Sequence, residues 1–249
     1  MKMRIAEICC GSYFDAKQSA LGGAERIELN SALHLGGLTP TLSTLCLVKE
    51  EFDLKVISMV RPRAAGFCYT EDEFKVMLKE CELLVKHGSD GIAFGCLNAD
   101  ASLNMEQNKK MIDIIKQYGK EAVFHRAFDC SKNPYETIEL LINLGVDRIL
   151  TSGLQPKAEA GIALLKDLQK QYGTEIELLA GSGVNSTKAK KILEETGISQ
   201  VHSSCKEWKT DPTTIVNGVS YSYASSPHEK DYDVVSKELV EQLFKTIQQ

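Results

Sequence analysis

Short apolar runs typical of strands alternate with longer stretches of helical periodicity along the whole chain. Eight runs have the length of buried strands, at residues 4–10, 25–30, 54–62, 90–95, 121–128, 147–153, 175–181 and 199–204. Eight stretches repeat apolar residues at helical spacing, at residues 14–21, 41–51, 71–87, 105–118, 134–144, 157–172, 186–195 and 234–247. Capping patterns support these boundaries, such as Thr70 with Glu73 and Asn133 before Pro134.

Strictly alternating units require parallel strands, because each helix returns the chain to the same end of the sheet. Eight units in 249 residues match the closed (β/α)8 barrel, or TIM barrel, in number and size. The sequence therefore predicts an α/β protein with a single barrel domain over residues 1–249. An open doubly wound sheet is the alternative, although it rarely uses eight nearly equal units.

The longest segment without a clear pattern covers residues 205–231, between the eighth strand and the last helix. In a barrel this loop leaves the carboxyl-terminal face, where binding sites are built. Loops of this length usually act as lids or interfaces, and a variable surface excursion is the alternative.

Composition narrows the classes of partner. The chain has 29 Lys and Arg against 34 Asp and Glu, a net charge of −5, with 43% hydrophobic residues. This balance is that of a globular protein, and the lack of a basic cluster argues against nucleic acid. Arg4 and Glu7 interrupt the first apolar run, and no run is long enough to span a bilayer. We expect a cytoplasmic protein with no membrane partner, whose oligomeric state, including a homodimer or larger homo-oligomer, is left open.

Alternation within the first two strands assigns their faces. Glu7 and Cys9 share one face of the first strand, and Glu28 lies on the polar face of the second. Since the apolar faces must meet the helices, both carboxylates should point into the barrel, where they need partners. The candidates are Arg61 and Arg63 after the third strand, and His125 and Arg126 at the end of the fifth. These charges predict a polar barrel mouth containing either a catalytic site or structural ion pairs.

Two short segments resemble a phosphate-binding arrangement. Gly181, Ser182 and Gly183 follow the seventh strand and precede a helix, and His202, Ser203 and Ser204 close the eighth. Glycines let the backbone approach an anion, which free N–H groups at a helix start can hold. Plain tight turns are the alternative.

Cysteine is frequent, with eight residues and no C-x-x-C pair, so reduced thiols are expected. Cys9 and Cys10 leave opposite faces of a strand and cannot share one metal. A linear Cu(I) site needs only two soft ligands, which Cys9 could provide with Cys96 or Cys130. Buried structural cysteine is the alternative for each of them.

Several motifs together resemble the CutC family, called copper homeostasis proteins. They are EICC at 7–10, GGAERIEL at 22–29, GGLTP at 36–40, FHRAFD at 124–129, RILTSG at 148–153, AGSGV at 180–184 and VHSS at 201–204. The resemblance covers nearly the whole chain. It implies a cytoplasmic barrel assigned to copper handling, with Cu(I) held by thiols near the strand ends. Cys9 matches the first such thiol, but Asn30 stands where family members often have a second cysteine.

Two functions therefore remain, with either a copper ion or a small molecule as partner. The first is a copper homeostasis protein that could bind Cu(I) through Cys9. The second is an enzyme acting on a small carbon compound, which could be phosphorylated. Glu7, Glu28 or His125 would serve there as acid or base, and Arg61 and Arg126 would bind an anion.

Overall fold

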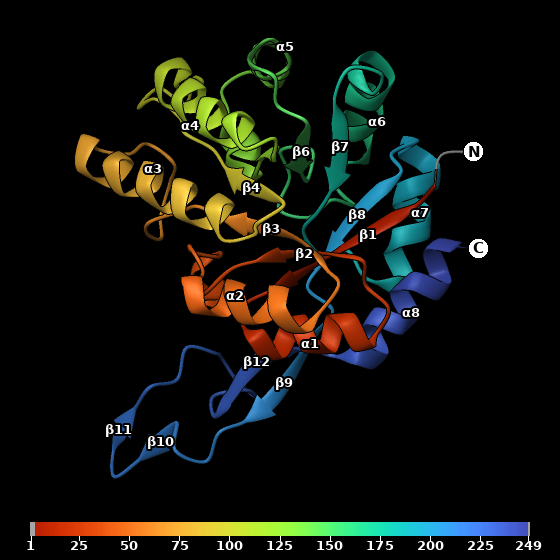
Figure 1. Ribbon diagram of the computed structural model, residues 1–249. Helices are drawn as coiled ribbons and strands as arrows, with labels where there is room; N and C mark the ends of the chain where they lie inside the picture. The colour runs from red at the N-terminus through yellow and green to blue at the C-terminus, as the bar shows by residue number, and fades with distance from the viewer. Residues whose placement is uncertain (1–2, 249) are drawn as a thin grey trace.

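Eight parallel strands close into a barrel in the computed structural model, which describes residues 3–248 (Figure 1). The strands are β1 (Ile5–Cys10), β2 (Arg26–Leu29), β3 (Lys55–Met59), β4 (Gly91–Phe94), β5 (Glu121–Phe124), β6 (Arg148–Thr151), β7 (Glu177–Ala180) and β8 (Gln200–Ser203). Each pairs with the next, and β8 returns to β1 with His202 opposite Glu7. The predicted TIM barrel is confirmed, and the open sheet is excluded.

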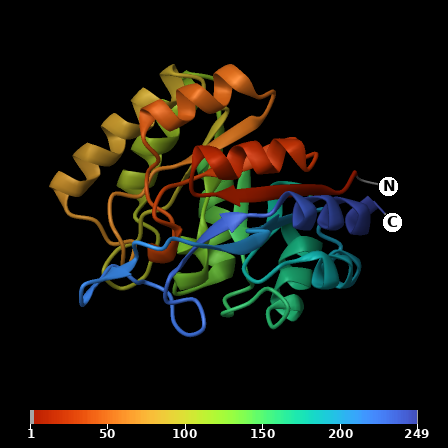
Figure 2. The same ribbon diagram turned by 90° about the horizontal axis from the view of Figure 1, so that it is seen from below.

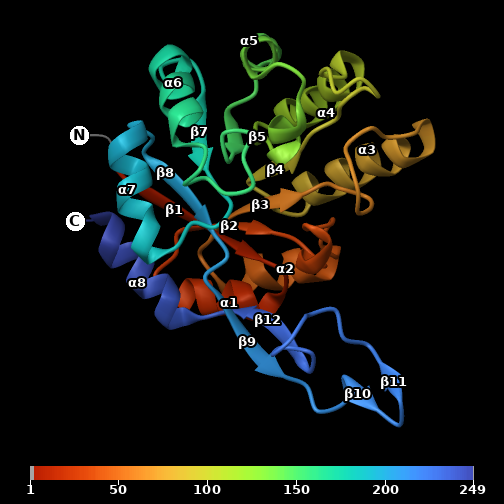
Figure 3. The same ribbon diagram turned by 180° about the vertical axis from the view of Figure 1, so that it is seen from behind.

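The helices form a ring around the strands, as views from opposite sides show (Figure 1, Figure 3). Within residues 3–248 they are α1 (Tyr13–Leu21), α2 (Leu42–Glu51), α3 (Glu71–Lys86), α4 (Met105–Gln117), α5 (Pro134–Leu144), α6 (Ile162–Tyr172), α7 (Ser186–Thr196) and α8 (Lys237–Gln248). None of the helices in this part of the chain is long and apolar enough to cross a membrane. The last helix, α8, packs back beside the first strand, where Arg4 donates a hydrogen bond to the carbonyl of Ile247 (3.2 Å).

Several predicted boundaries were wrong, including that of the third strand, which stops at Met59 rather than at 62. Helix α6 begins at Ile162 rather than at 157, and α8 begins at Lys237 because Val234 and Val235 belong to a strand. Strand β5 stops at Phe124, and a short 3₁₀ helix, η2 (Arg126–Cys130), follows it. In FHRAF the apolar residues recur at i, i+3 and i+4, which is the spacing of a helical turn, so the predicted strand was too long.

The segment after β8 forms an arm of paired strands. Strand β9 (Lys206–Thr210) pairs antiparallel with β12 (Asp231–Val235), and β10 (Ile215–Val216) pairs with β11 (Val219–Ser220) at the tip. The arm extends outward from the barrel (Figure 1, Figure 2). Its base is fixed by the backbone N–H of Val235, which donates to the buried carboxylate of Asp15 (2.8 Å).

Two apolar regions lie on the two sides of the barrel wall. Outward-facing residues such as Ile8, Ile27 and Phe124 pack beneath the helices in the main core. A small second cluster fills the interior: Ile57, Met59, Ala93 and Val123. This cluster comes from β3, β4 and β5, and a layer of charged residues lies inside the barrel beside it.

The charged layer is built around Arg148, whose side chain is 2% exposed. Its guanidinium lies 3.5 Å from Glu7, 2.7 Å from Glu121 and 3.1 Å from Glu177. Arg26 adds a second contact to Glu7 at 2.7 Å. Glu7 therefore faces inward, but its partners are Arg26, Arg148 and, at 3.8 Å, His202, rather than the predicted Arg61, Arg63, His125 or Arg126.

We expect Arg148→Met to lower the free energy of unfolding by about 3–5 kcal/mol, because it leaves the fully buried Glu7 with one partner fewer. Chemical denaturation measures this change. The control is Lys109→Met, which breaks an exposed pair with Asp113 and should alter stability by less than about 1 kcal/mol. A loss below about 1 kcal/mol for Arg148→Met would contradict the role assigned to this layer.

Candidate functional site

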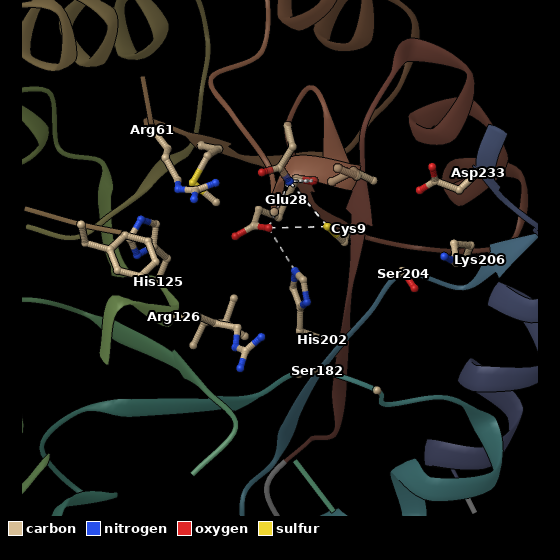
Figure 4. A pocket seen from close by; sticks show the side chains of 17 residues that line it. Cys9, Glu28, Arg61, His125, Arg126, Ser182, His202, Ser204, Lys206 and Asp233 are labelled. Atoms are coloured by element: carbon tan, nitrogen blue, oxygen red, sulfur yellow. Dashed lines mark hydrogen bonds and ion pairs between the residues drawn. The ribbon is translucent and has the colours of Figure 1, made fainter. Parts of the chain in front are cut away.

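A cavity of about 350 Å³ opens at the carboxyl-terminal mouth of the barrel (Figure 4). Its polar and charged lining comprises Cys9, Glu28, Asn30, Arg61, His125, Arg126, Ser182, His202, Ser204, Lys206 and Asp233. The predicted residues Glu28, Arg61, His125 and Arg126 thus meet in one place. Glu7 is not part of this lining, although its carboxylate lies 3.8 Å from Nε2 of the cavity residue His202 and so connects the charged layer to the cavity wall.

A buried acid–base pair forms one wall. The Nε2 atom of His202 lies 3.2 Å from Oε2 of Glu28. Asn30 donates to the same oxygen at 3.1 Å, and the thiol of Cys9 donates to it at 3.7 Å. The second carboxylate oxygen of Glu28 points away from these partners, toward the middle of the cavity (Figure 4).

The charges of this pair are set by burial and by mutual attraction. Burial alone would lower the pKa of His202, but the carboxylate of Glu28 raises it well above its usual value. Burial would likewise raise the pKa of Glu28, and the opposing attraction of His202 holds it below the ordinary range. At neutral pH the two therefore form an imidazolium–carboxylate ion pair.

His125 on the facing wall has the opposite character. Burial lowers its pKa to about 4, with Arg61 and Arg126 adding to the shift against the pull of Glu28. Its Nδ1 accepts a hydrogen bond from the backbone N–H of Ala127 (3.2 Å). The neutral ring therefore carries its proton on Nε2, so His125 is a hydrogen-bond donor at neutral pH.

Arg61 fixes loops as much as it lines the cavity. Its guanidinium donates to the backbone carbonyls of Leu35 and Gly37 at 2.9 Å each, and to that of Ala65 at 2.6 Å. These bonds tie the segments after β2 and β3 together across the mouth. Because these carbonyls occupy its N–H groups, Arg61 can act on an anion mainly through its positive charge.

Arg126 is held in place but stays accessible. Its Nε donates to the carboxylate of Asp129 at 2.7 Å, and its Nη2 donates to Ser152 at 2.9 Å. Asp129 is itself fixed by the hydroxyl of Thr151 (2.6 Å). Because the Arg126 side chain remains 40% exposed, its other N–H groups can reach a ligand.

The predicted anion-binding residues divide into two groups. Ser182, Gly183 and Ser204 line the cavity, whereas Gly181 and Ser203 do not. Ser203 lies on the face of β8 opposite His202, and its hydroxyl donates to the carbonyl of Val184 (2.7 Å). The turn after β7 therefore contributes only part of the predicted set.

One thiol reaches the cavity. Ligand atoms of Cys9, Glu28 and His202 lie within 4.8 Å of one another. Burial raises the pKa of Cys9 to about 12, so this thiol is protonated. Cys96 lies in the outer core and Cys130 is exposed, and neither lines the cavity, so the predicted pairing with Cys9 is not formed. The available soft ligands are one sulfur and one imidazole nitrogen.

The sequence does not indicate the roles of three residues that line the cavity. The sequence places His202 in the predicted phosphate-binding arrangement. In the structure Gln200 and His202 face into the barrel, whereas Val201 and Ser203 face outward. Lys206 and Asp233 come from the arm, whose strand pairing no local pattern indicated.

Comparisons with known proteins agree with the motifs. A profile of the CutC family matches residues 4–207. A CutC family protein of Treponema denticola is 40% identical over 99% of this chain and 100% of its own length. One from Klebsiella pneumoniae is 42% identical over 83% of this chain and 82% of its own.

Solved structures give the same result for the fold. A crystal structure of the candidate copper homeostasis protein CutC from Streptococcus agalactiae has a TM-score of 0.77 at 27% identity, covering 81% of this chain and 99% of that one. Phosphoribosyl anthranilate isomerase from Thermococcus kodakaraensis has a TM-score of 0.57 at 14% identity, covering 98% and 99%. The second likeness concerns the barrel fold alone.

In the metal-free protein we expect His202 to remain protonated above pH 7, because Glu28 raises its pKa. Its stabilising contribution should be complete below about pH 6.5 and decline as the pH rises through the folded-state pKa. Side-chain NMR titration measures this pKa. Glu28→Gln should lower it, whereas Glu195→Gln on the exposed side of α7 should not. A wild-type His202 that titrates below pH 6.5 would contradict the ion pair.

Proposed function

We propose that this chain, which belongs to the CutC family, acts through the cavity at the barrel mouth. It would bind a small organic anion there and transfer protons to and from it. The observation that carries this proposal is the buried Glu28–His202 pair, which faces a cavity whose other charges are mostly cationic.

The charge balance favours an anionic ligand. Arg61, Arg126, Lys206 and protonated His202 line the cavity against the carboxylates of Glu28 and Asp233. An excess of positive charge in a concave site attracts anions and strengthens their binding. A soft metal ion makes no use of guanidinium or ammonium groups.

The pair has the groups that proton transfer requires. The free oxygen of Glu28 points into the cavity and can accept a proton from a bound carbon acid (Figure 4). His202 keeps this carboxylate ionised until the proton arrives. The Nε2–H of His125 is buried beside the cavity without a partner among the described residues, and the exposed Arg126 can hold an acidic substituent.

We expect the protein to catalyse exchange of solvent deuterium into an enolisable anion, because proton abstraction in D₂O is followed by deuteron return. NMR can follow the signals of a panel of keto acids, hydroxyketones and their phosphate esters. Glu28→Gln should abolish the exchange, and the matched control Glu195→Gln should retain it. Absence of exchange across the whole panel, or full exchange by Glu28→Gln, would contradict the proposal.

Copper binding at the same residues is the second candidate. The family and the S. agalactiae structure support an assignment to copper homeostasis. The observation in its favour is the convergence of Cys9, Glu28 and His202 within 4.8 Å. Thiolate and imidazole are suitable Cu(I) ligands, but the thiol of Cys9 and the imidazolium of His202 would each first have to lose a proton.

We expect the reduced protein to bind Cu(I) no more tightly than a chain with several accessible thiols does, because Cys9 has no second thiol beside it. Competition with a Cu(I)-specific chelator tests this, with Cys9→Ser compared against Cys68→Ser, which removes an exposed thiol outside the cavity. A tight site of one equivalent that is lost only in Cys9→Ser would instead establish the copper function.

A further inference from the structure

A second hollow of about 360 Å³ lies beside the cavity, at the base of the arm. Leu33, Lys206 and Asp233 line both spaces, so the two are neighbours that share a wall. The second hollow lies between the segment after β2 and the arm. Each volume is within the range of about 300–1,000 Å³ that small-molecule sites occupy.

Aromatic rings form much of the far wall. His34 and Tyr223 stack with ring centroids 4.5 Å apart, and Trp208 and His228 stack at the same spacing. Tyr223 stays 43% exposed. Aromatic surface left open to water inside a concave site favours contact with another ring.

The hollow is preformed rather than loosely arranged. Tyr223 accepts a hydrogen bond from the backbone N–H of Asp233 (2.8 Å) and donates one to its carboxylate. The β9–β12 pairing sets Asp233 opposite Trp208, and Asp15 fixes the base of the arm. The rings therefore have defined positions before a ligand arrives, which reduces the entropy lost on binding.

Lys206 lines both spaces. Its ammonium lies 4.2 Å from the centroid of the Trp208 ring. Among residues 3–248 it has no carboxylate within ion-pair distance. A cation without a carboxylate partner at this point can bind an acidic group of a ligand that extends from one space into the other.

We propose that the hollow beside the arm is a second subsite, which takes an aromatic or heteroaromatic ring of a ligand whose anionic group lies in the barrel-mouth cavity. This inference rests on the proposed function and specifies its substrate class. The natural ligand is then an acidic compound that carries a planar ring, rather than a short-chain acid.

Trp208 is the only tryptophan in the chain, so its fluorescence reports directly on the hollow. The probes are inorganic phosphate, phenyl phosphate, benzyl phosphate and 2-phenylethyl phosphate, which share one anionic group and differ in the reach of the ring. Calorimetry gives their affinities. We expect at least one aryl phosphate to bind ten or more times as tightly as phosphate and to change the Trp208 emission, which phosphate alone should leave nearly unaltered.

Variants separate the two spaces. His34→Ala and Tyr223→Leu should remove most of the advantage of the aryl ligands while leaving phosphate affinity unchanged, and Tyr223→Phe should retain part of it. Tyr221→Ala is the matched control, since Tyr221 is 82% exposed on the same arm and lines neither space. Arg126→Met should weaken phosphate and aryl phosphates alike.

The outcomes distinguish the two proposals. Equal affinities for phosphate and all aryl phosphates would overturn the second subsite and leave the anion-binding cavity intact. An aryl advantage that survives both His34→Ala and Tyr223→Leu would also overturn it. Failure of phosphate and of every aryl phosphate to bind would overturn the anion-binding cavity, and the subsite with it.

Discussion

A carboxylate inside a closed barrel must be matched by a cation, because little water reaches it there. This chain meets the requirement twice and in different ways. Glu7 is neutralised by Arg26 and Arg148, which remain charged at every physiological pH. Glu28 is neutralised by His202, whose charge can change. The first arrangement is a permanent structural element, and the second is one that can perform chemistry.

The loops at the mouth are arranged around charged groups that bind backbone. Arg61 holds three carbonyl groups, and Asp15 accepts the N–H that fixes the arm. Asp129 accepts hydrogen bonds from Thr151 at the end of β6 and from the backbone of the following segment, and it aligns Arg126. Charge at the rim thus shapes the cavity, while the groups left free for a ligand are the few whose hydrogen bonds are incomplete, such as Arg126 and Lys206.

The fold followed from local pattern, whereas the site followed only in part. Period-two alternation correctly placed Glu7 and Glu28 inside the barrel, and eight repeated units identified the closed sheet. Which inward side chains meet depends on the stagger between strands, which alternation does not contain. The sequence therefore indicates Arg26 and Arg148 only as the starts of strands, and His202 only as part of a phosphate-binding arrangement. The hollow beside the arm depends on β9–β12 pairing between segments that looked irregular.

Copper binding and proton transfer would compete for the same three residues, Cys9, Glu28 and His202. Binding Cu(I) at Cys9 and His202 would require removing one proton from a thiol of pKa about 12 and another from an imidazolium that Glu28 stabilises. Both losses become easier as the pH rises, so copper occupancy should increase with pH. Acid–base chemistry needs the opposite state, with His202 charged and Glu28 ionised but unligated. At neutral pH both protons are in place, so copper binding would have to displace them, whereas the proposed proton transfer would not.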